Sequence, residues 1–430
     1  MVKTVNFDKG AFLHIFWIAM CLLLFTTTGC NEKKLETKTK IELPAKDILG
    51  NPDYRAISYG GYRKISRDAQ PSVEELKEDM KILQAIGIKI IRTYNVHLAH
   101  ASTVLKAIRA LKTEDPDFEM YVMLGAWIDC KNAWTDKEPI HNLESERNAE
   151  EIAKAVELAN EYPDIVKILA VGNEAMVKWA AAYYVEPYII LKWVKHLQQL
   201  KKDGKLNKDL WITSSDNFAS WGGGGEEYHV PELKELIHVV DYISMHTYPM
   251  HDTHYNPDFW RDGEEGENDM EEITQAMDRS VRYAQSQYNS VKEYMKRMGV
   301  DKPIHIGETG WASFCDGFYG PEGSRACDEY KQSRFHTLIR NWTDQEGISC
   351  FYFEAFDEIW KDAGNPNGSE NHFGLFTIDG KAKFAIWDEV DQGTFEDLTR
   401  GGNTISKTFD GDKSKFMKTV FAPPLMIKTN

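Results

Sequence analysis

The chain has 430 residues, of which 42% are hydrophobic and 27% charged, and its formal net charge at pH 7 is -16. That length is enough for one large domain or two ordinary ones with a sizeable core. The acidic balance argues against nucleic acid as a partner, because a negative surface repels phosphate backbones, whereas neutral or weakly charged glycans are compatible with it.

The first thirty residues read as a targeting segment. Lys3 and Lys9 precede an apolar stretch over residues 11–25, which is too short for a stable membrane helix and is typical of a secretory signal peptide. The small residues before Cys30 resemble a bacterial lipobox, which predicts cleavage before Cys30 and acylation of its thiol. The alternative is a signal cleaved elsewhere and a soluble secreted protein. We expect a signal peptide over 1–29, a tether over 30–50, and a lipid-anchored protein of the bacterial cell envelope, on the outer membrane surface or in the periplasm.

Apolar, β-branched runs alternate with amphipathic segments along the middle of the chain, as in parallel sheets with helical crossovers. The expected strands span residues 55–60, 89–94, 120–127, 166–172, 210–214, 240–248, 303–308 and 348–354. Helical patterns begin near residues 73, 144, 187, 270 and 325, the first behind a capping box of Ser72 and Glu75. Eight repeats predict a (β/α)8 TIM barrel over residues 51–390 with a C-terminal extension over 391–430. An open doubly wound sheet is the runner-up, but no Gly-rich nucleotide loop follows the first strand.

Two glutamates close expected strands: Glu174 ends the run Val-Gly-Asn-Glu, and Glu308 stands in Gly-Glu-Thr-Gly-Trp. A carboxylic acid and a carboxylate at the same end of a barrel are what retaining glycoside hydrolysis requires. Other polar and aromatic residues at the strand ends are candidates to bind a sugar, because aromatic rings stack on pyranose faces and polar groups bind hydroxyls. These are Tyr59, Arg92, Tyr94, Trp127, Asn173, Asp216, Asn217, His246, Tyr248, Trp311, Glu354 and Lys361.

These motifs, in this order, resemble glycoside hydrolase family 17. The resemblance covers roughly residues 51–390 and includes a Phe-Glu-Ala-Phe-Asp-Glu-Ile-Trp-Lys block over 353–361 and His-Thr-Tyr-Pro over 246–249. Ala312 and His246 depart from the pattern, where the family often has Pro and Asn. The resemblance implies activity on β-1,3-glucan, with Glu174 as general acid/base and Glu308 as nucleophile.

The mechanism expected for such a pair fixes further roles. Glu174 must start protonated, whereas Glu308 stays ionised with hydrogen-bond donors such as Tyr248. Retention predicts carboxyl groups roughly 5 to 5.5 Å apart. Asn173 is expected to hold the sugar 2-hydroxyl or, alternatively, to cap the strand–helix turn. Glu354 and Lys361 are expected to form a charged pair that is either structural or supports the site.

Several loops carry residues with two interpretations. Cys315 and Cys327 enclose a Gly-rich loop and are candidates for a disulfide in an oxidising compartment. Trp127, Trp134, Trp221 and Trp311 are expected to set specificity, and the glycines at 222–225 form either a mobile cleft-edge loop or an ordinary turn. Residues 251–268 match no metal motif and are expected to form a hydrated loop. We expect no metal and no cofactor.

Three functional hypotheses follow. The first is an endo-acting β-1,3-glucan hydrolase, a monomer acting on polysaccharide or oligosaccharide. The second is a transglycosylase that uses the same covalent intermediate and passes the glycosyl unit to another sugar. The third, a catalytically inactive glycan-binding lipoprotein, is disfavoured because both glutamates and Asn173 are present.

Overall fold

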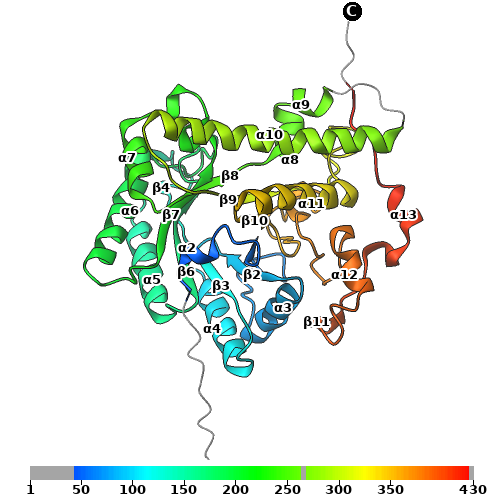
Figure 1. Ribbon diagram of the computed structural model, residues 1–430, viewed down its shortest axis with the longest axis horizontal. Helices are drawn as coiled ribbons and strands as arrows, with labels where there is room; N and C mark the ends of the chain where they lie inside the picture. The colour runs from blue at the N-terminus through cyan, green and yellow to red at the C-terminus, as the bar shows by residue number, and fades with distance from the viewer. Residues whose placement is uncertain (1–42, 263–267, 426–430) are drawn as a thin grey trace, which may run out of the picture. The chain divides into compact units, whose positions relative to one another are not determined.

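The computed structural model describes residues 43–262 and 268–425. Its centre is a closed barrel in which the strands follow the order β1-β10-β9-β8-β7-β6-β3-β2, all parallel to their neighbours (Figure 1). The strands are β1 Arg55–Ser58, β2 Ile88–Arg92, β3 Tyr121–Ala126, β6 Val166–Asn173, β7 Trp211–Asn217, β8 Ile243–His246, β9 Ile304–Gly310 and β10 Cys350–Phe353. The eight predicted strands and the (β/α)8 barrel are therefore confirmed, and the open doubly wound sheet is excluded.

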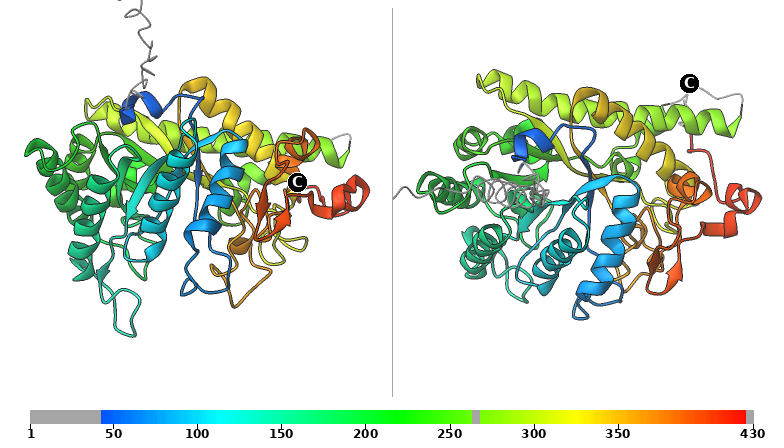
Figure 2. Two further views of the ribbon diagram at one scale, coloured as in Figure 1. Left: turned by 90° about the horizontal axis from the view of Figure 1, so that it is seen from below. Right: turned by 60° about the horizontal axis from the view of Figure 1, so that its bottom comes forward.

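Helices surround the barrel (Figure 2). The long ones are α3 Val73–Ala85, α4 Ala99–Glu114, α5 Arg147–Glu161, α6 Pro187–Lys202, α7 Pro231–Val239, α10 Asp269–Arg297 and α11 Glu329–Glu346. The predicted capping box is present at α3, because the Ser72 hydroxyl accepts from the Glu75 amide and the Glu75 carboxylate accepts from the Ser72 amide. The sequence patterns placed five of these helices but missed α4 and α7.

The barrel interior is apolar where the strands begin. Ile90, Met123, Ile168 and Phe351 form one buried cluster with Ala45 and Ile48 of the short helix α2 (Ala45–Ile48). Residues 43–50, predicted to belong to the tether, instead pack against the barrel because this helix buries apolar side chains there. The remaining predicted tether, the signal peptide and Cys30 lie outside the described residues.

One further expectation about a loop is wrong, and for a second loop one of the two alternatives is excluded. The segment predicted as a hydrated loop contains the end of α8 (Pro249–Tyr255) and all of α9 (Asp258–Arg261), because Trp260 is buried and its indole donates to the Ser324 carbonyl. The glycines after Trp221 are tightly packed rather than a cleft-edge loop. A side chain at Gly222, whose φ is +90°, would lie 2.2 Å from the Tyr294 ring, and Trp221 itself is fully buried.

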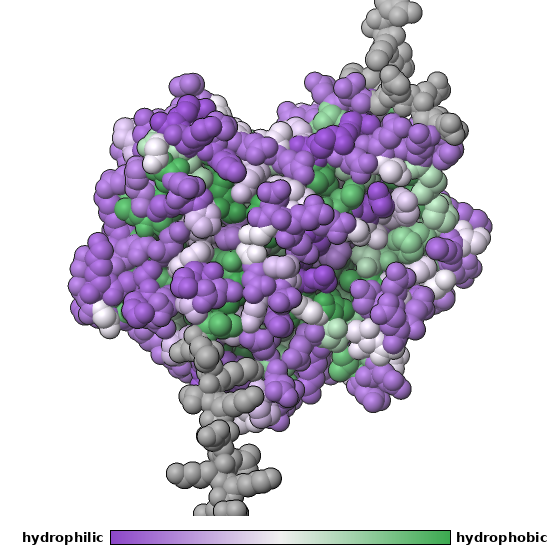
Figure 3. Space-filling model, in the orientation of Figure 1, coloured by the Kyte–Doolittle hydropathy of each residue, from purple (hydrophilic) through white to green (hydrophobic). Residues whose placement is uncertain are grey.

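The C-terminal part adds small elements beside the barrel: α12 Trp387–Asp391, the hairpin of β11 Thr399–Arg400 and β12 Asn403–Thr404, and α13 Lys413–Met417. They lie near α3 and α11 in Figure 1. The same face, drawn by hydropathy in Figure 3, is mostly hydrophilic with hydrophobic residues scattered among the polar ones. No helix within residues 43–262 and 268–425 is long and apolar enough to cross a membrane.

Candidate active site

A cleft of about 1580 Å³ lies where the barrel strands end, and both glutamates, Glu174 and Glu308, line it. Glu174 directly follows β6 and Glu308 stands within β9, with β7 and β8 between them in the barrel. The carboxyl ends of the strands are where a TIM barrel places its active site. The cleft is large enough for several sugar units.

The Glu308 carboxylate accepts three hydrogen bonds. Arg92 Nη1 donates to Oε2 at 2.5 Å, the Tyr94 hydroxyl donates to Oε2 at 2.9 Å, and the Tyr248 hydroxyl donates to Oε1 at 2.6 Å. Burial alone would raise the pKa of Glu308, but the nearby His246 and Arg92 and the two tyrosine hydrogen bonds outweigh it and lower this pKa to about 2. Glu308 is therefore ionised at neutral pH, and its lone pairs are held in a fixed orientation.

Arg92 connects this carboxylate to the neighbouring amide. Its guanidinium is 1% exposed; Nη1 also donates to the Gly307 carbonyl, and Nη2 donates to Asn173 Oδ1 at 2.5 Å. Since the Asn173 oxygen is used by Arg92, the amide is oriented by a fixed partner and its NH2 group is the part left to bind a ligand. A planar guanidinium suits this double role because its donors are rigidly spaced.

Glu174 has a different environment. Its side chain is 24% exposed, and its Oε1 lies 3.1 Å from His246 Nδ1. The other ring nitrogen of His246 lies 2.7 Å from the Ser215 hydroxyl, so the imidazole is held between the two. Glu174 has a φ of +46°, an uncommon backbone for a non-glycine residue, and its amide donates to the Ser215 carbonyl. The backbone and the histidine together aim this carboxyl group into the cleft.

Glu354, Glu358 and Lys361 form a buried charged cluster at the end of β10. Lys361 Nζ lies 3.6 Å from Glu358 and 4.0 Å from Glu354, and it covers the Phe353 ring at 4.4 Å. Burial raises the pKa of Glu354 well above its usual range, and Glu358 adds to this against the opposing charge of Lys361. The predicted Glu354–Lys361 pair is thus part of a three-residue cluster in which Lys361 and Glu358 line the cleft.

The structure brings most of the predicted site residues together. Those that line the cleft are Tyr59, Tyr94, Trp127, Asn173, Glu174, Asn217, Tyr248, Glu308 and Lys361. Tyr59 contributes only its ring, because its hydroxyl donates to Asp79 Oδ2 at 2.8 Å. Asn217 Oδ1 accepts from the Ala219 amide and so also shapes the loop.

Five predicted binding residues lie behind the cleft wall: Arg92, Asp216, His246, Trp311 and Glu354. Trp311 is fully buried between Trp260 and Phe335, and its indole donates to the Ala326 carbonyl at 2.8 Å. Asp216 is fully buried and accepts from the Met176 amide at 2.7 Å; burial raises its pKa to about 7. Their predicted sugar contacts are therefore wrong, since none of these side chains reaches the cleft surface.

Other cleft residues were missed because most of them stand on the loops and helices beyond the strand ends. Aromatic and histidine side chains dominate this set, which comprises Tyr62, His97, His100, Trp179, Phe218, His251, Tyr255, Tyr283, Phe353, Trp360 and Phe373. Phe373 packs edge-on against Tyr248, the donor to Glu308, at 6.0 Å. The signal that could have identified them is the number of aromatics within a few residues of each strand end.

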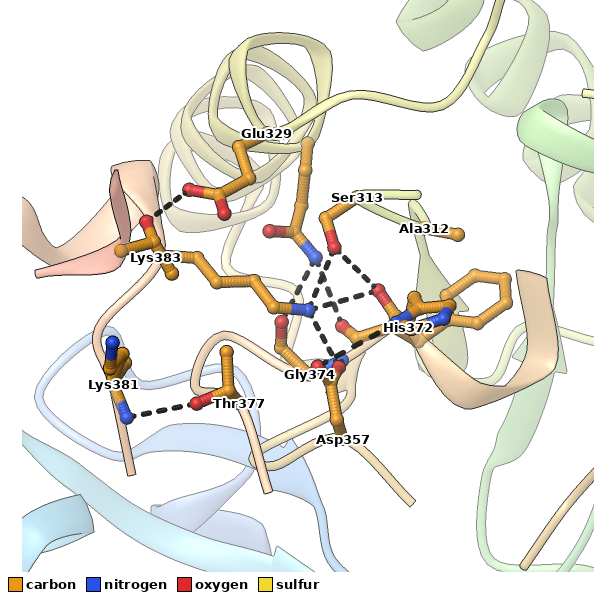
Figure 4. Close-up of polar contacts among 12 residues, drawn as sticks. Ala312, Ser313, Glu329, Asp357, His372, Gly374, Thr377, Lys381 and Lys383 are labelled. Carbon is orange, nitrogen blue, oxygen red and sulfur yellow. Dashed lines mark hydrogen bonds and ion pairs between the residues drawn. The ribbon is translucent and has the colours of Figure 1, made fainter. Parts of the chain in front are cut away.

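The side chain of a buried lysine, Lys383, donates hydrogen bonds to three loops behind this wall (Figure 4). Lys383 Nζ donates to Asp357 Oδ1 at 2.6 Å, to the Ser313 hydroxyl at 2.8 Å and to the His372 carbonyl at 3.1 Å. These bonds fix three segments to one another: the loop after β9, the loop after β10 and the segment leading to Phe373. Cys315 and Cys327 are buried free thiols in contact with each other. The predicted disulfide is therefore absent from this structure.

Among the residues that the structure describes, no three His, Cys, Asp or Glu side chains gather as ligands for a metal ion. The cleft holds two carboxyl groups in unlike environments, backed by an arginine, an amide and two tyrosines. Such a set transfers protons and stabilises positive charge at a sugar carbon.

Comparison with known proteins gives the family. The profile of the BtgE/BtgC glycoside hydrolase domain matches residues 56–374. The crystal structure of an endo-laminarinase from Formosa Hel1_33_131 is 65% identical, covers 90% of this chain and 99% of its own, and superposes with a TM-score of 0.89. A family 17 β-1,3-glucanosyltransferase from Rhizomucor miehei is 20% identical over 77% of this chain and 96% of its own, with a TM-score of 0.53, and supports the fold alone.

A putative glucan endo-1,3-β-glucosidase, btgC, of Aspergillus niger is 24% identical over 70% of this chain and 37% of its own length. The chain spans less than half the length of this and the next two curated relatives. The match of the family profile nevertheless covers the whole barrel up to the segment that follows β10. The chain belongs to the BtgE/BtgC glycoside hydrolase family and is a glycoside hydrolase.

Proposed function

We propose that this protein hydrolyses β-1,3-glucan of the laminarin type internally, by double displacement, with Glu308 as nucleophile and Glu174 as general acid/base. The observation that carries the reaction type is the contrast between the two carboxyl groups. Glu308 is ionised and held by three donors, whereas Glu174 is partly exposed and bound to one histidine. The substrate class is supported by the similarity to the endo-laminarinase from Formosa Hel1_33_131.

In the first half-reaction Glu174 donates its proton to the glycosidic oxygen while a Glu308 oxygen attacks the anomeric carbon. The carbon–oxygen bond breaks, the reducing-end part of the glucan leaves, and a glycosyl ester forms on Glu308. Arg92 holds Asn173 so that its NH2 group can donate to the sugar 2-hydroxyl, a contact that strengthens as positive charge develops. In the second half-reaction Glu174 takes a proton from water, which attacks the same carbon and releases Glu308.

The test of the roles uses Glu308→Ala and Glu174→Ala in the purified chain with laminarin. We expect the wild type to release mixed oligosaccharides early, as an endo-acting enzyme does, and Glu308→Ala to release none. Sodium azide should restore cleavage of an activated aryl β-glucoside by Glu174→Ala, because azide needs no general base, and the product should be a β-glycosyl azide. Cleavage of β-1,4-glucan but not laminarin by the wild type would contradict the substrate class.

The configuration of the first-formed sugar tests the mechanism separately. Double displacement releases the β-anomer, and proton NMR of the anomeric signals in the first minutes would detect it. Release of the α-anomer would mean inversion, for which the two carboxyl groups must stand about 6.5 to 9.5 Å apart, and would overturn the proposal.

Transglycosylation is the second candidate, because the same glycosyl ester can react with a sugar hydroxyl in place of water. The aromatic residues that line the cleft favour transglycosylation, because their rings offer stacking surfaces for an acceptor sugar. Incubation with laminari-oligosaccharides of one length decides between them. Products longer than the supplied sugar would indicate transfer, and only shorter products would indicate hydrolysis.

We also propose that the mature protein is lipid-anchored in the bacterial cell envelope, on the basis of the signal-like residues 1–29 and Cys30. Labelled palmitate should be incorporated into the full-length chain in a bacterial host and not into Cys30→Ser. Incorporation into neither chain would favour the alternative of a soluble secreted protein.

A further inference from the structure

We propose that Trp127 and Trp134 form a platform that binds the leaving-group side of the glucan, so that cleavage is favoured where several sugar units extend toward the reducing end. This inference rests on the proposed function and specifies which part of the substrate these residues hold. These two side chains are the tryptophan platform.

Both indoles line the cleft, and they stand close together with ring centroids 6.4 Å apart. Tyr183 stacks on Trp134 at 5.0 Å with an interplanar angle of 21°, and it lies 5.2 Å from Trp127. Trp134 nonetheless keeps 59% of its surface exposed. A ring supported on one face and open on the other is what stacking on a pyranose requires.

Hydrogen bonds hold Trp127 in place. Asp129, which is 2% exposed, accepts a hydrogen bond from the Trp127 side chain and pairs with Arg147 at 2.9 Å. The Trp127 amide donates to Glu151 at 2.9 Å. Because its side chain and its backbone are both fixed, Trp127 loses little conformational freedom when a ligand binds.

A small hairpin carries Trp134. Its strands are β4 (Cys130–Lys131) and β5 (Ile140–Glu144), and the Cys130 amide donates to the Tyr183 carbonyl, which links the hairpin to the loop after β6. Trp134 has a φ of +61°, in the left-handed region that bulky residues rarely adopt. An exposed tryptophan held in an unfavourable backbone conformation is consistent with a ring positioned for contact with a ligand.

The chemistry of the two glutamates tells which side of the scissile bond the platform occupies. Glu174 protonates the glycosidic oxygen, and Glu308 attacks the anomeric carbon from the opposite face of the same sugar, so the leaving group departs from the face that is turned toward Glu174. Tyr183 is on the loop that starts at Glu174, and Trp127 follows β3, the neighbour of β6. The platform therefore flanks Glu174, whereas β9, which carries Glu308, stands on the opposite side of the barrel.

The test is the cleavage pattern of laminarihexaose labelled at its reducing end, for the wild type, Trp134→Ala and Trp134→Phe. The wild type should give mostly labelled fragments of three or more sugars. Trp134→Ala should shift the pattern toward shorter labelled fragments and raise the KM for the hexaose about two- to tenfold, the value of one aromatic stack. Trp134→Phe should recover most of the wild-type pattern, which a merely structural role would not explain.

Phe318→Ala is the matched control, because Phe318 is also 59% exposed but does not line the cleft. It should leave the pattern and the KM unchanged. A shift toward longer labelled fragments in Trp134→Ala would place the platform on the glycone side and overturn the inference, as would an unchanged pattern. Failure of the wild type to cleave the hexaose at all would instead refute the proposed function, so the two failures are distinguishable.

Discussion

Arg92 joins three parts of the site, because it binds the Glu308 carboxylate, the Asn173 amide oxygen and the Gly307 carbonyl. A buried cation at this place serves two purposes. It keeps the nucleophile ionised, and it orients the amide that meets the sugar. Both purposes can be separated experimentally, since one needs only charge and the other needs the shape of the guanidinium.

We expect Arg92→Met to lower kcat/KM on the order of a hundredfold. Loss of the positive charge favours the neutral carboxyl, so the pKa of Glu308 rises and the acidic limb of the pH profile moves up by about one unit or more. Arg92→Lys should keep the acidic limb in place but still lose kcat, because a single ammonium cannot bind Asn173 and Glu308 in the same fork geometry. Arg109→Met, a surface control, should leave the profile unchanged, and identical profiles for all variants would contradict the assignment.

Asp216 makes a prediction about stability. Its pKa is raised from 3.8 to about 7, first by burial. Between about pH 4 and 7 the folded state keeps a proton that the unfolded chain has released, so this residue lowers stability as pH rises through that window, by about 2–4 kcal/mol in total. Asp216→Asn cannot titrate. Its melting temperature relative to wild type should therefore be higher at pH 8 than at pH 5, and parallel curves from pH 4.5 to 8 would refute the shift.

At the scale of elements, the sequence was informative about strands and less so about which side chains reach the cleft. Parallel strands are buried on both faces, so their apolar, β-branched runs are easy to recognise. Helix α4 was missed although it has a regular apolar face, because no side chain caps its start at Leu98. Trp311 and Asp216 were correctly predicted to lie at strand ends near the site. Whether such a side chain turns into the cleft or away from it depends on neighbours distant in sequence, such as Phe335 and Met176.

The loops of the cleft wall depend on Lys383, which was not predicted. Lys383→Met would leave Asp357, 6% exposed, without its closest cation, and we expect a loss of about 3–5 kcal/mol in the free energy of unfolding. Lys383→Met with Asp357→Asn should recover part of it, because the unpaired charge is gone. Lys381→Met is the control: its bond to Thr377 comes from the backbone and survives (Figure 4). Urea denaturation of the four proteins measures these differences, and equal losses for Lys381→Met and Lys383→Met would contradict this explanation.

At the scale of the whole molecule, one buried ion pair joins the C-terminal elements to the barrel. Arg400 in β11 binds Asp79 in α3 through two nitrogens, at 2.9 and 3.2 Å, and also donates to the Ile378 carbonyl. Asp79 in turn accepts from the Tyr59 hydroxyl and from Arg63. Arg400 and Asp79 are more than 300 positions apart in the sequence. Since Tyr59 lines the cleft, their ion pair connects the C-terminal elements to the wall of the site.

Arg400→Met should therefore lower the free energy of unfolding by about 3–5 kcal/mol, because Asp79 is 0% exposed and, among the described residues, keeps Arg63 as its one charged partner. The effect on catalysis should be small by comparison, since Arg400 touches neither glutamate; the folded fraction of Arg400→Met should keep kcat within about threefold of wild type. Lys407→Met removes an ion pair with Asp391, whose side chain is 65% exposed, and should cost less than about 1 kcal/mol. Chemical denaturation combined with activity on laminarin measures both quantities in the same samples. A loss of kcat without a loss of stability in Arg400→Met would mean that the C-terminal elements act on the cleft directly and do more than hold the barrel wall in place.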